Sequence, residues 1–274
     1  MTGRKPEDDA ASSPSVGEPR PRSLRDLAGL TQARIALGAH GSGVPTGAAL
    51  RFNLDHARAR EAVWTAMDAE ALAAALAAQG LASLEVWSNA ANRADYLRRP
   101  DLGRTLSSGS ADALRAARGE APGFDLAIVV ADGLSATAVA LNAAPLAGAL
   151  AERAARLGWR LAPVVIAHQG RVALGDPVGA MLGARCVALL VGERPGLSAA
   201  DSLGCYLTFA PEPGLPDSRR NCLSNIREGG LGIEAAADQI MALLALIRAQ
   251  TTSGVALRRT DEAAAIERRG GELT

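Results

Sequence analysis

Two patterns of apolar and polar residues divide this chain. Before about residue 80 the signals are helical, whereas beyond Gly123 short apolar runs alternate with amphipathic segments. The second pattern is typical of strands alternating with helices in a parallel sheet. The expected strands are 84–88, 126–130, 163–167, 186–191 and 205–209, and helices are expected over 24–30, 48–67, 69–80, 145–157, 177–182 and 234–250.

Local end signals set the expected boundaries of several helices. Asp68 precedes an Ala-rich run and is expected to cap it. Pro145 is expected to begin the helix that follows the strand at 126–130. Asp176 and Pro177 predict an N-cap and a first helical residue, and Gly183 is expected to close that helix.

The N-terminal part differs in composition from the rest. Residues 1–22 are rich in Pro, Ser, Gly and acidic residues without an apolar period, which predicts a disordered tail. Residues 23–110 are expected to be mostly helical and 111–274 to form a Rossmann-like α/β domain. The connector AHGSGVP lacks a preceding strand, so we interpret it as a flexible link rather than a phosphate cradle.

Composition supports an α/β fold and excludes some functions. Hydrophobic residues make up 48% of the 274 residues but aromatics only 3%, so the apolar mass is Ala, Leu and Val. A formal net charge of zero argues against nucleic-acid binding. Three cysteines without close metal-type spacing predict reduced thiols and no zinc site. With no apolar run long enough to span a bilayer and no secretory signal pattern, we expect a cytoplasmic protein without membrane contact.

Polar, glycine-bearing segments follow three of the expected strands. They are ADGLSA at 131–136, HQGRV at 168–172 and GERPGL at 192–197. Because ligands of open parallel sheets bind outside the carboxyl ends of the strands, three such loops predict one shared site. The alternative is that they are ordinary turns between strands and helices.

Common catalytic and phosphate-binding motifs are missing from these loops. The dinucleotide fingerprint and the phosphate loop that ends in Gly-Lys-Ser/Thr do not occur. Ser135 lacks the Gly-x-Ser-x-Gly elbow of a hydrolase nucleophile. Two alternatives remain: a non-catalytic subunit with a Rossmann-like crevice that binds a nucleotide or nothing, and a hydrolase that uses Ser135.

Several long sequence segments resemble those of a known family. Six segments resemble the small subunit of ethanolamine ammonia-lyase. They are VVADGLSATA, APVVIAHQGRVALGD, LLVGERPGLSAADSLGCYLTF, RRNCLSNIREGG, LTQARIALGAHGSGVPTGAALRFNLDHARAREAV and YLRRPDLGRTL. The resemblance runs from about Leu30 to Arg258. It implies an enzyme that converts ethanolamine to acetaldehyde and ammonia with adenosylcobalamin, which lies between this subunit and a large catalytic subunit.

The resemblance also implies the cofactor contacts and the assembly. Family contacts with cobalamin match Val172, Glu193 and Cys222 here, the last in an expected loop after the fourth central strand. Valine can pack on a corrin face, a carboxylate can accept amide hydrogen bonds, and cysteine is a small, weakly polar contact. Without the resemblance, these would be a core valine, a solvated charge and a buried thiol. A hetero-oligomer with the large subunit, enclosed in a protein-shelled microcompartment in some bacteria, is also implied.

Four neighbouring residues are weaker candidates. Asp132 and Ser135 are equally suited to capping the following helix, and Arg194 to an interfacial ion pair; Asp201 is the fourth. The sequence lacks the Asp-x-His-x-x-Gly motif, whose histidine replaces the lower base on cobalt in some cobalamin-binding folds. The resemblance therefore favours cobalamin whose own dimethylbenzimidazole stays on cobalt.

Overall fold

The computed structural model describes residues 34–35, 37–38, 41–119, 123–193, 195–197 and 199–258. The tail expected over 1–22 and the helix expected over 24–30 lie outside the described residues. The chain divides into two compact units, Met1–Arg51 and Phe52–Thr274, and the second contains the whole sheet. None of the helices in the described part combines the length and apolar character needed to cross a bilayer.

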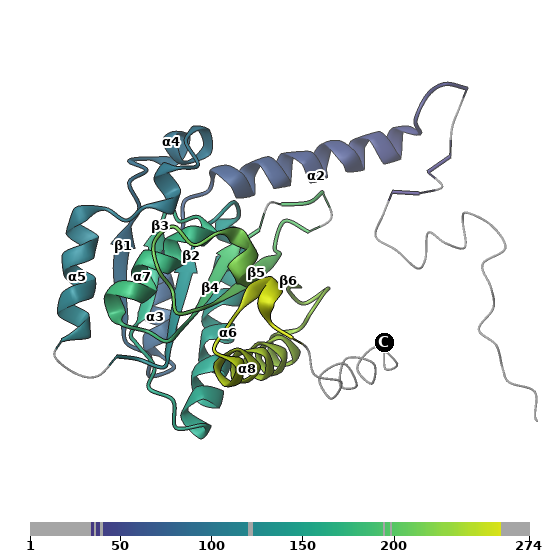
Figure 1. Cartoon of the computed structure of the whole chain (residues 1–274). Coiled ribbons are helices and arrows are strands. Elements are labelled where there is room, and N and C mark those ends of the chain that lie inside the picture. The colour runs from purple at the N-terminus through teal and green to yellow at the C-terminus, as the bar shows by residue number, and fades with distance from the viewer. Residues whose placement is uncertain are drawn as a thin grey trace, which may run out of the picture. The chain divides into compact units, whose positions relative to one another are not determined.

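A six-stranded sheet in the order β1-β3-β2-β4-β5-β6 forms the centre of the second unit (Figure 1). Its strands are β1 (Ser83–Trp87), β2 (Leu126–Ala131), β3 (Val164–His168), β4 (Cys186–Gly192), β5 (Leu203–Phe209) and β6 (Arg220–Ile226). Strands β1 to β4 pair in parallel, β5 pairs antiparallel with β4, and β6 pairs antiparallel with β5. The expected α/β class with a mostly parallel sheet is confirmed.

Two expectations about the far edge of the sheet are wrong. The fourth expected central strand, β5, is antiparallel, because the connection over 193–202 is shorter than the roughly dozen residues that a parallel crossover needs. The RNCLSN segment is not a loop but forms β6. The strand is buried only at Arg220 and Ile226, so its side chains lack the alternating apolar pattern that predicts a strand. Strand β1 extends the sheet on the other side of residue 110, and the domain boundaries at 22 and 110 stay predictions.

Helices α3 (Ala69–Ala77), α6 (Ala136–Arg156) and α8 (Ile233–Gln250) pack on one face of the sheet, and α5 (Ser108–Arg118) and α7 (Gly175–Leu182) pack on the other. The described residues also form helices α2 (Thr46–Trp64) and α4 (Arg93–Arg98) and the short 3-10 turns η1 (Leu102–Arg104), η2 (Val172–Leu174), η3 (Asp217–Arg219) and η4 (Gly254–Ala256). The expected cap at Asp68 is confirmed, since its carboxylate accepts a hydrogen bond from Ala71 N at 2.9 Å. Gly183 also ends α7 as expected, in the left-handed conformation.

Two helix starts differ from the prediction. Helix α6 begins nine residues before Pro145, at Ala136, because the Ser135 hydroxyl accepts from Ala138 N and the intervening residues favour helix. Proline therefore lies inside α6. Helix α7 has Leu174 at its N-cap rather than Asp176, whose carboxylate is instead paired with Arg220.

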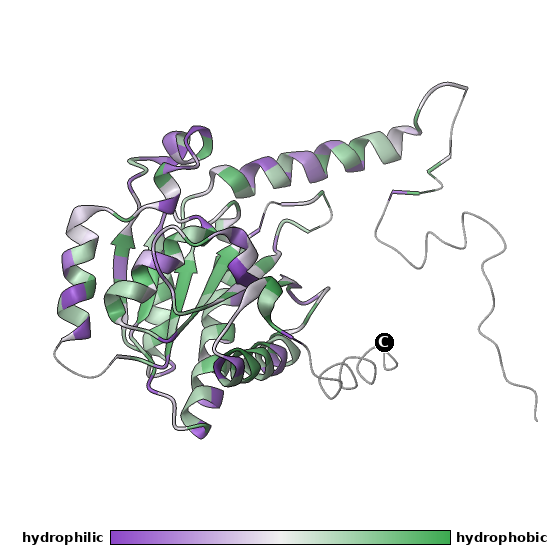
Figure 2. Ribbon diagram, in the orientation of Figure 1, coloured by the Kyte–Doolittle hydropathy of each residue, from purple (hydrophilic) through white to green (hydrophobic). Residues whose placement is uncertain are grey.

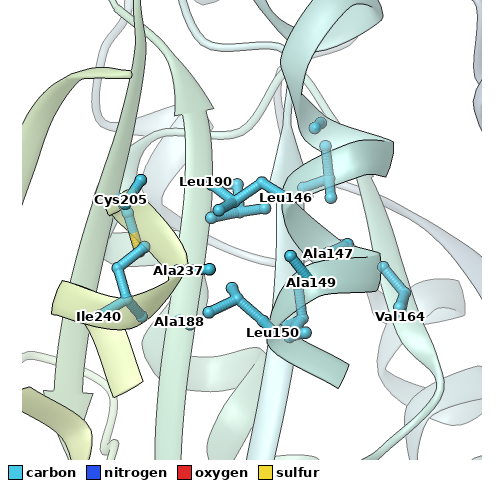
Figure 3. Packing of buried hydrophobic residues seen from close by; sticks show 14 of the residues in the cluster. Leu146, Ala147, Ala149, Leu150, Val164, Ala188, Leu190, Cys205, Ala237 and Ile240 are labelled. Atoms are coloured by element: carbon cyan, nitrogen blue, oxygen red, sulfur yellow. The ribbon is translucent and has the colours of Figure 1, made fainter. Parts of the chain in front are cut away.

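Side chains alternate across the strands and build one core on each face. In β2, Leu126, Ile128 and Val130 pack with α3, α6 and α8, whereas the intervening residues pack with α5 and α7. Figure 2 shows the central strands as the most hydrophobic part of the ribbon. Figure 3 shows part of the first core, where Leu146 of α6 lies beside Leu190 of β4, Leu150 lies beside Ala188, and Ile240 of α8 lies near Cys205 of β5. The small residues let helix and strand backbones approach closely.

Candidate functional site

The carboxyl ends of β2 and β3 form a topological switch point. The chain after β2 enters α6 on one face of the sheet, and the chain after β3 enters α7 on the other. Neighbouring strands whose connections diverge in this way leave a crevice at their carboxyl ends, where ligands of α/β sheets bind. The predicted loops after β2, β3 and β4 all reach this edge.

Two adjoining hollows lie along this edge. The first, of about 380 Å³, is lined by Tyr96, Gly133, Leu134, Arg171, Val172, Val191, Gly192, Glu193 and Tyr206. The second, of about 470 Å³, is lined by Pro100, Arg104, Arg171, Val172, Ala173, Tyr206, Asp217, Arg220 and Cys222. They share Arg171, Val172 and Tyr206. The structure thus brings all three sequence-predicted contacts together: Val172 lines both hollows, Glu193 the first and Cys222 the second.

Backbone close packing forms the floor of the first hollow. Gly133 has a positive φ of 56°, and a Cβ there would lie 2.2 Å from Gly192 O. The amide of Leu134 donates to the same carbonyl oxygen at 2.8 Å. Only glycine permits this approach, so the loops after β2 and β4 are locked together beneath Glu193.

Glu193 is held by the residue that precedes β5 and by β6. Its carboxylate accepts a hydrogen bond from the buried Ser202 hydroxyl and a longer one, 3.4 Å, from Asn225 N. A Cβ on Gly204 would lie 2.8 Å from Glu193 Oε1, so glycine leaves the space that this side chain occupies. The half-buried carboxylate is therefore oriented before any ligand binds.

Cys222 and Tyr206 are directly opposite each other on β6 and β5. They share a side-chain hydrogen bond. Cys222 is exposed as a residue, but partial burial of its sulfur raises the pKa of the thiol above its ordinary value. The hydrogen bond from Tyr206 opposes this shift, and the nearby Glu193 charge adds to it. Burial first, and then Cys222, raises the pKa of Tyr206 to about 12. At neutral pH both groups are uncharged, so this wall offers weak donors and acceptors rather than a reactive thiolate.

Arg171 separates the two hollows and is fixed by Tyr96. Its guanidinium lies 4.1 Å from the centre of the Tyr96 ring, and Nη2 donates to Tyr96 O at 3.0 Å. Arg93 stacks on the same tyrosine at 4.7 Å. The Tyr96 hydroxyl donates to Gly170 O at 3.2 Å, and burial raises its pKa. These contacts fix the segment that presents Val172.

Asp132 joins the loops after β2 and β3. One carboxylate oxygen accepts from Gly170 N at 3.1 Å, and the other pairs with Arg93 at 3.3 Å. Burial raises the Asp132 pKa, opposed by the Arg93 charge. Asp132 is buried and lines neither hollow, so it fixes loop positions from behind the site.

The other weak candidates lie away from both hollows or outside the described residues. Ser135 is fully buried, and its hydroxyl donates to Ala200 O while accepting from the first turn of α6. No base among the described residues is hydrogen-bonded to this hydroxyl, so the structure offers no support for a Ser135 hydrolase. Asp201 lies 3.8 Å from Arg227 and does not line either hollow. Arg194 falls outside the described residues.

Sequence reasoning missed Tyr206, Arg171 and Tyr96. Tyr206 had a usable signal: it alternates with the buried Cys205 and Leu207, which places it on the opposite face of β5. Arg171 precedes Val172 in the HQGRV loop. Tyr96 comes from α4, a helix that the sequence did not predict, and no local pattern connects it to a loop 75 residues later.

Comparison with known proteins identifies the family. The model of the family "Ethanolamine ammonia-lyase light chain (EutC)" matches residues 21–258. An ethanolamine ammonia-lyase small subunit from Rhodopseudomonas palustris (strain BisA53) is 52% identical over 88% of this chain and 91% of its own length. The chain belongs to the ethanolamine ammonia-lyase light-chain family. The predicted resemblance is confirmed.

Two further ethanolamine ammonia-lyase small subunits show similar coverage. The protein from Bradyrhizobium diazoefficiens is 53% identical over 92% of this chain and 95% of its own length. The protein from Pseudomonas syringae pv. tomato is 49% identical over 87% of this chain and 83% of its own length. Membership in the ethanolamine ammonia-lyase light-chain family makes the chain a lyase subunit, and the matched range contains every residue of both hollows.

Proposed function

We propose that this chain holds adenosylcobalamin against a large subunit, and that the assembled enzyme converts ethanolamine to acetaldehyde and ammonia. The observation that carries the proposal is the placement of Val172, Glu193 and Cys222, which line adjoining hollows although the first and the last are 50 residues apart in sequence. The family membership and the small-subunit names of its relatives support the larger partner.

The donors and acceptors in the hollows fit a corrin. A corrin is broad, largely apolar and fringed with amides. Val172 supplies apolar contact, the oriented Glu193 carboxylate can accept amide N–H groups, and the Tyr206–Cys222 pair supplies neutral polar contacts. The buried Nε of Arg171 has no hydrogen-bond partner among the described residues, so one donor beside the hollows remains unused. These side chains would bind and orient the cofactor, and adenosylcobalamin would supply radicals through homolysis of its cobalt–carbon bond.

Both hollows open to solvent, which supports a shared site. Glu193 and Tyr206 are part-buried and Cys222 is exposed, so a broad ligand resting on them keeps one face in water. Exclusion of water and of side reactions then requires another protein surface. A large subunit that covers the ligand would supply that surface and the substrate pocket. We place the enzyme in the cytoplasm, within a protein-shelled microcompartment in bacteria that build one.

Reconstitution tests the proposal. The purified chain, the large subunit and their mixture are each incubated with adenosylcobalamin, and both corrin absorbance after gel filtration and acetaldehyde formation are measured. We expect retained corrin and turnover from the mixture and no turnover from this chain alone. Turnover by the isolated chain would refute the division of labour, and a mixture without corrin would favour a nucleotide-binding or structural subunit.

A further inference from the structure

The two hollows differ in charge. Arg171 lines both hollows, and in the first its charge is balanced by the Glu193 carboxylate. The second hollow lacks Glu193 and is lined by two further arginines, Arg104 and Arg220. Asp217 also lines the second hollow, but its carboxylate pairs with Arg220 at 2.7 Å. Arg220 is further paired with the buried Asp176. The charge on Arg220 is therefore compensated within the protein.

In the second hollow, Arg104 and Arg171 keep their charges uncompensated. No carboxylate among the described residues forms an ion pair with either, and the Arg104 side chain makes no hydrogen bond in that part of the chain. Within the described part of the chain, the Arg171 guanidinium contacts a carbonyl oxygen and a tyrosine ring, both neutral. The second hollow thus carries an excess of positive charge beside the apolar wall of Val172.

The local backbone holds these two arginines together. Arg171 N donates to Gly103 O at 2.8 Å, which fixes η1 against the start of η2. A Cβ on Gly103 would lie 2.8 Å from Arg171 Cγ and 3.0 Å from Gln169 O. Glycine is therefore required for the contact that places Arg104, the next residue, on the same hollow as Arg171. This is a built juxtaposition rather than two unrelated surface charges.

We propose that the second hollow binds the phosphodiester of the cobalamin nucleotide loop through Arg104 and Arg171. The inference rests on the proposed function and assigns the anionic part of the same ligand. Guanidinium groups donate paired hydrogen bonds that match phosphate oxygens. A phosphodiester carries one negative charge, whereas the amide fringe of the corrin is neutral and suits the Glu193 side of the site. The charge difference between the hollows thus sets which way round the ligand lies.

Two truncated cofactors isolate the phosphate. Adenosylcobinamide lacks the nucleotide loop, and adenosylcobinamide phosphate adds only a phosphate, so both lack dimethylbenzimidazole. Their dissociation constants are measured by equilibrium dialysis on the assembled large- and small-subunit complex. We expect Arg104→Gln to weaken binding of the phosphate form about three- to fivefold, because an exposed charge pair contributes modestly, and to leave cobinamide binding unchanged. Arg104→Glu should lower the affinity for adenosylcobinamide phosphate roughly tenfold or more, and Arg104→Lys should retain most of that affinity.

Arg98→Gln is the matched control. Arg98 is exposed on α4 and lies outside both hollows. Its substitution by glutamine removes the same charge, so the dissociation constants of both ligands should stay unchanged. Equal losses for both ligands on Arg104→Gln, or no loss for either, would overturn the phosphate site. Glu193→Gln separates this failure from that of the proposed function: it should weaken both ligands alike, and if it weakens neither, the corrin is not held here at all.

Discussion

Replacing Glu193 with glutamine tests the cofactor-binding edge most directly. The change keeps the size of the side chain and removes its charge. In the structure the carboxylate accepts hydrogen bonds from Ser202 and Asn225, and Gly204 leaves the space for it. The amide keeps one accepting oxygen, so it can stay bound to Ser202, but its nitrogen cannot accept an amide N–H from a corrin side chain.

The expected loss follows from the type of hydrogen bond. A hydrogen bond to a charged group contributes about 1.5 to 3 kcal/mol, so cobalamin affinity should fall roughly tenfold or more. Stability should change little, because Glu193 is part-buried and its fixed partners can still be satisfied. Spectrophotometric titration of the assembled enzyme gives the affinity, and thermal unfolding gives the stability.

Glu212→Gln provides the control for Glu193. Glu212 is an exposed carboxylate in the turn after β5 and lines neither hollow. Its substitution should leave cobalamin affinity unchanged. If Glu193→Gln binds cobalamin as tightly as the unaltered enzyme, Glu193 is not a contact. If it instead unfolds the protein, its role is structural, and Gly204→Ala, which displaces the same carboxylate, should then destabilise the fold as well.

Three further predictions concern the walls of the second hollow. Cys222→Ser should keep most turnover in the assembled enzyme, whereas Cys222→Trp should block cobalamin titration by overpacking; normal binding by the tryptophan variant would remove Cys222 from the site. Alkylation followed by mass spectrometry should modify Cys222 but not the buried Cys186 and Cys205, and because the Cys222 pKa is raised, its rate should still be climbing at a pH where an ordinary thiol has levelled off. Arg220→Met should lower the free energy of unfolding by about 3 kcal/mol in urea titrations, since it leaves the buried Asp176 unpaired; a loss below about 1 kcal/mol would contradict that account.

The sequence predicted the central strands well because their signal is local. Strands β2 and β4 are continuous apolar runs buried at every position, and that pattern admits few other structures. Strand β6 was missed because its exposed side chains are polar and its stability comes from pairing with β5. The start of α6 was misplaced because proline was taken as a beginning, whereas the cap at Ser135 lies ten residues earlier.

The candidate site was partly predictable for the same reason. Val172, Glu193 and Cys222 lie in words that identify the family, so similarity alone pointed to them. Tyr96 depends on a contact with Arg171 that joins an unpredicted helix to a distant loop. Such pairs come from tertiary packing, which hydrophobic periodicity does not predict. Arg104 reaches the second hollow through the same kind of contact, between Gly103 and Arg171.

At the edge of the sheet, some residues hold the loops in position and others are placed to contact the cofactor. Asp132 and Arg93 join the loops from behind, and Arg220, which also lines the second hollow, anchors β6 to α7 through Asp176. These buried charges hold the loops in place without a ligand, so binding need not order them, and little affinity is lost to conformational entropy. Substitutions in this buried set should therefore lower stability first and affinity only through it. Substitutions at Glu193 and Arg104 should change affinity at nearly constant stability, and this separation identifies which side chains meet the cofactor.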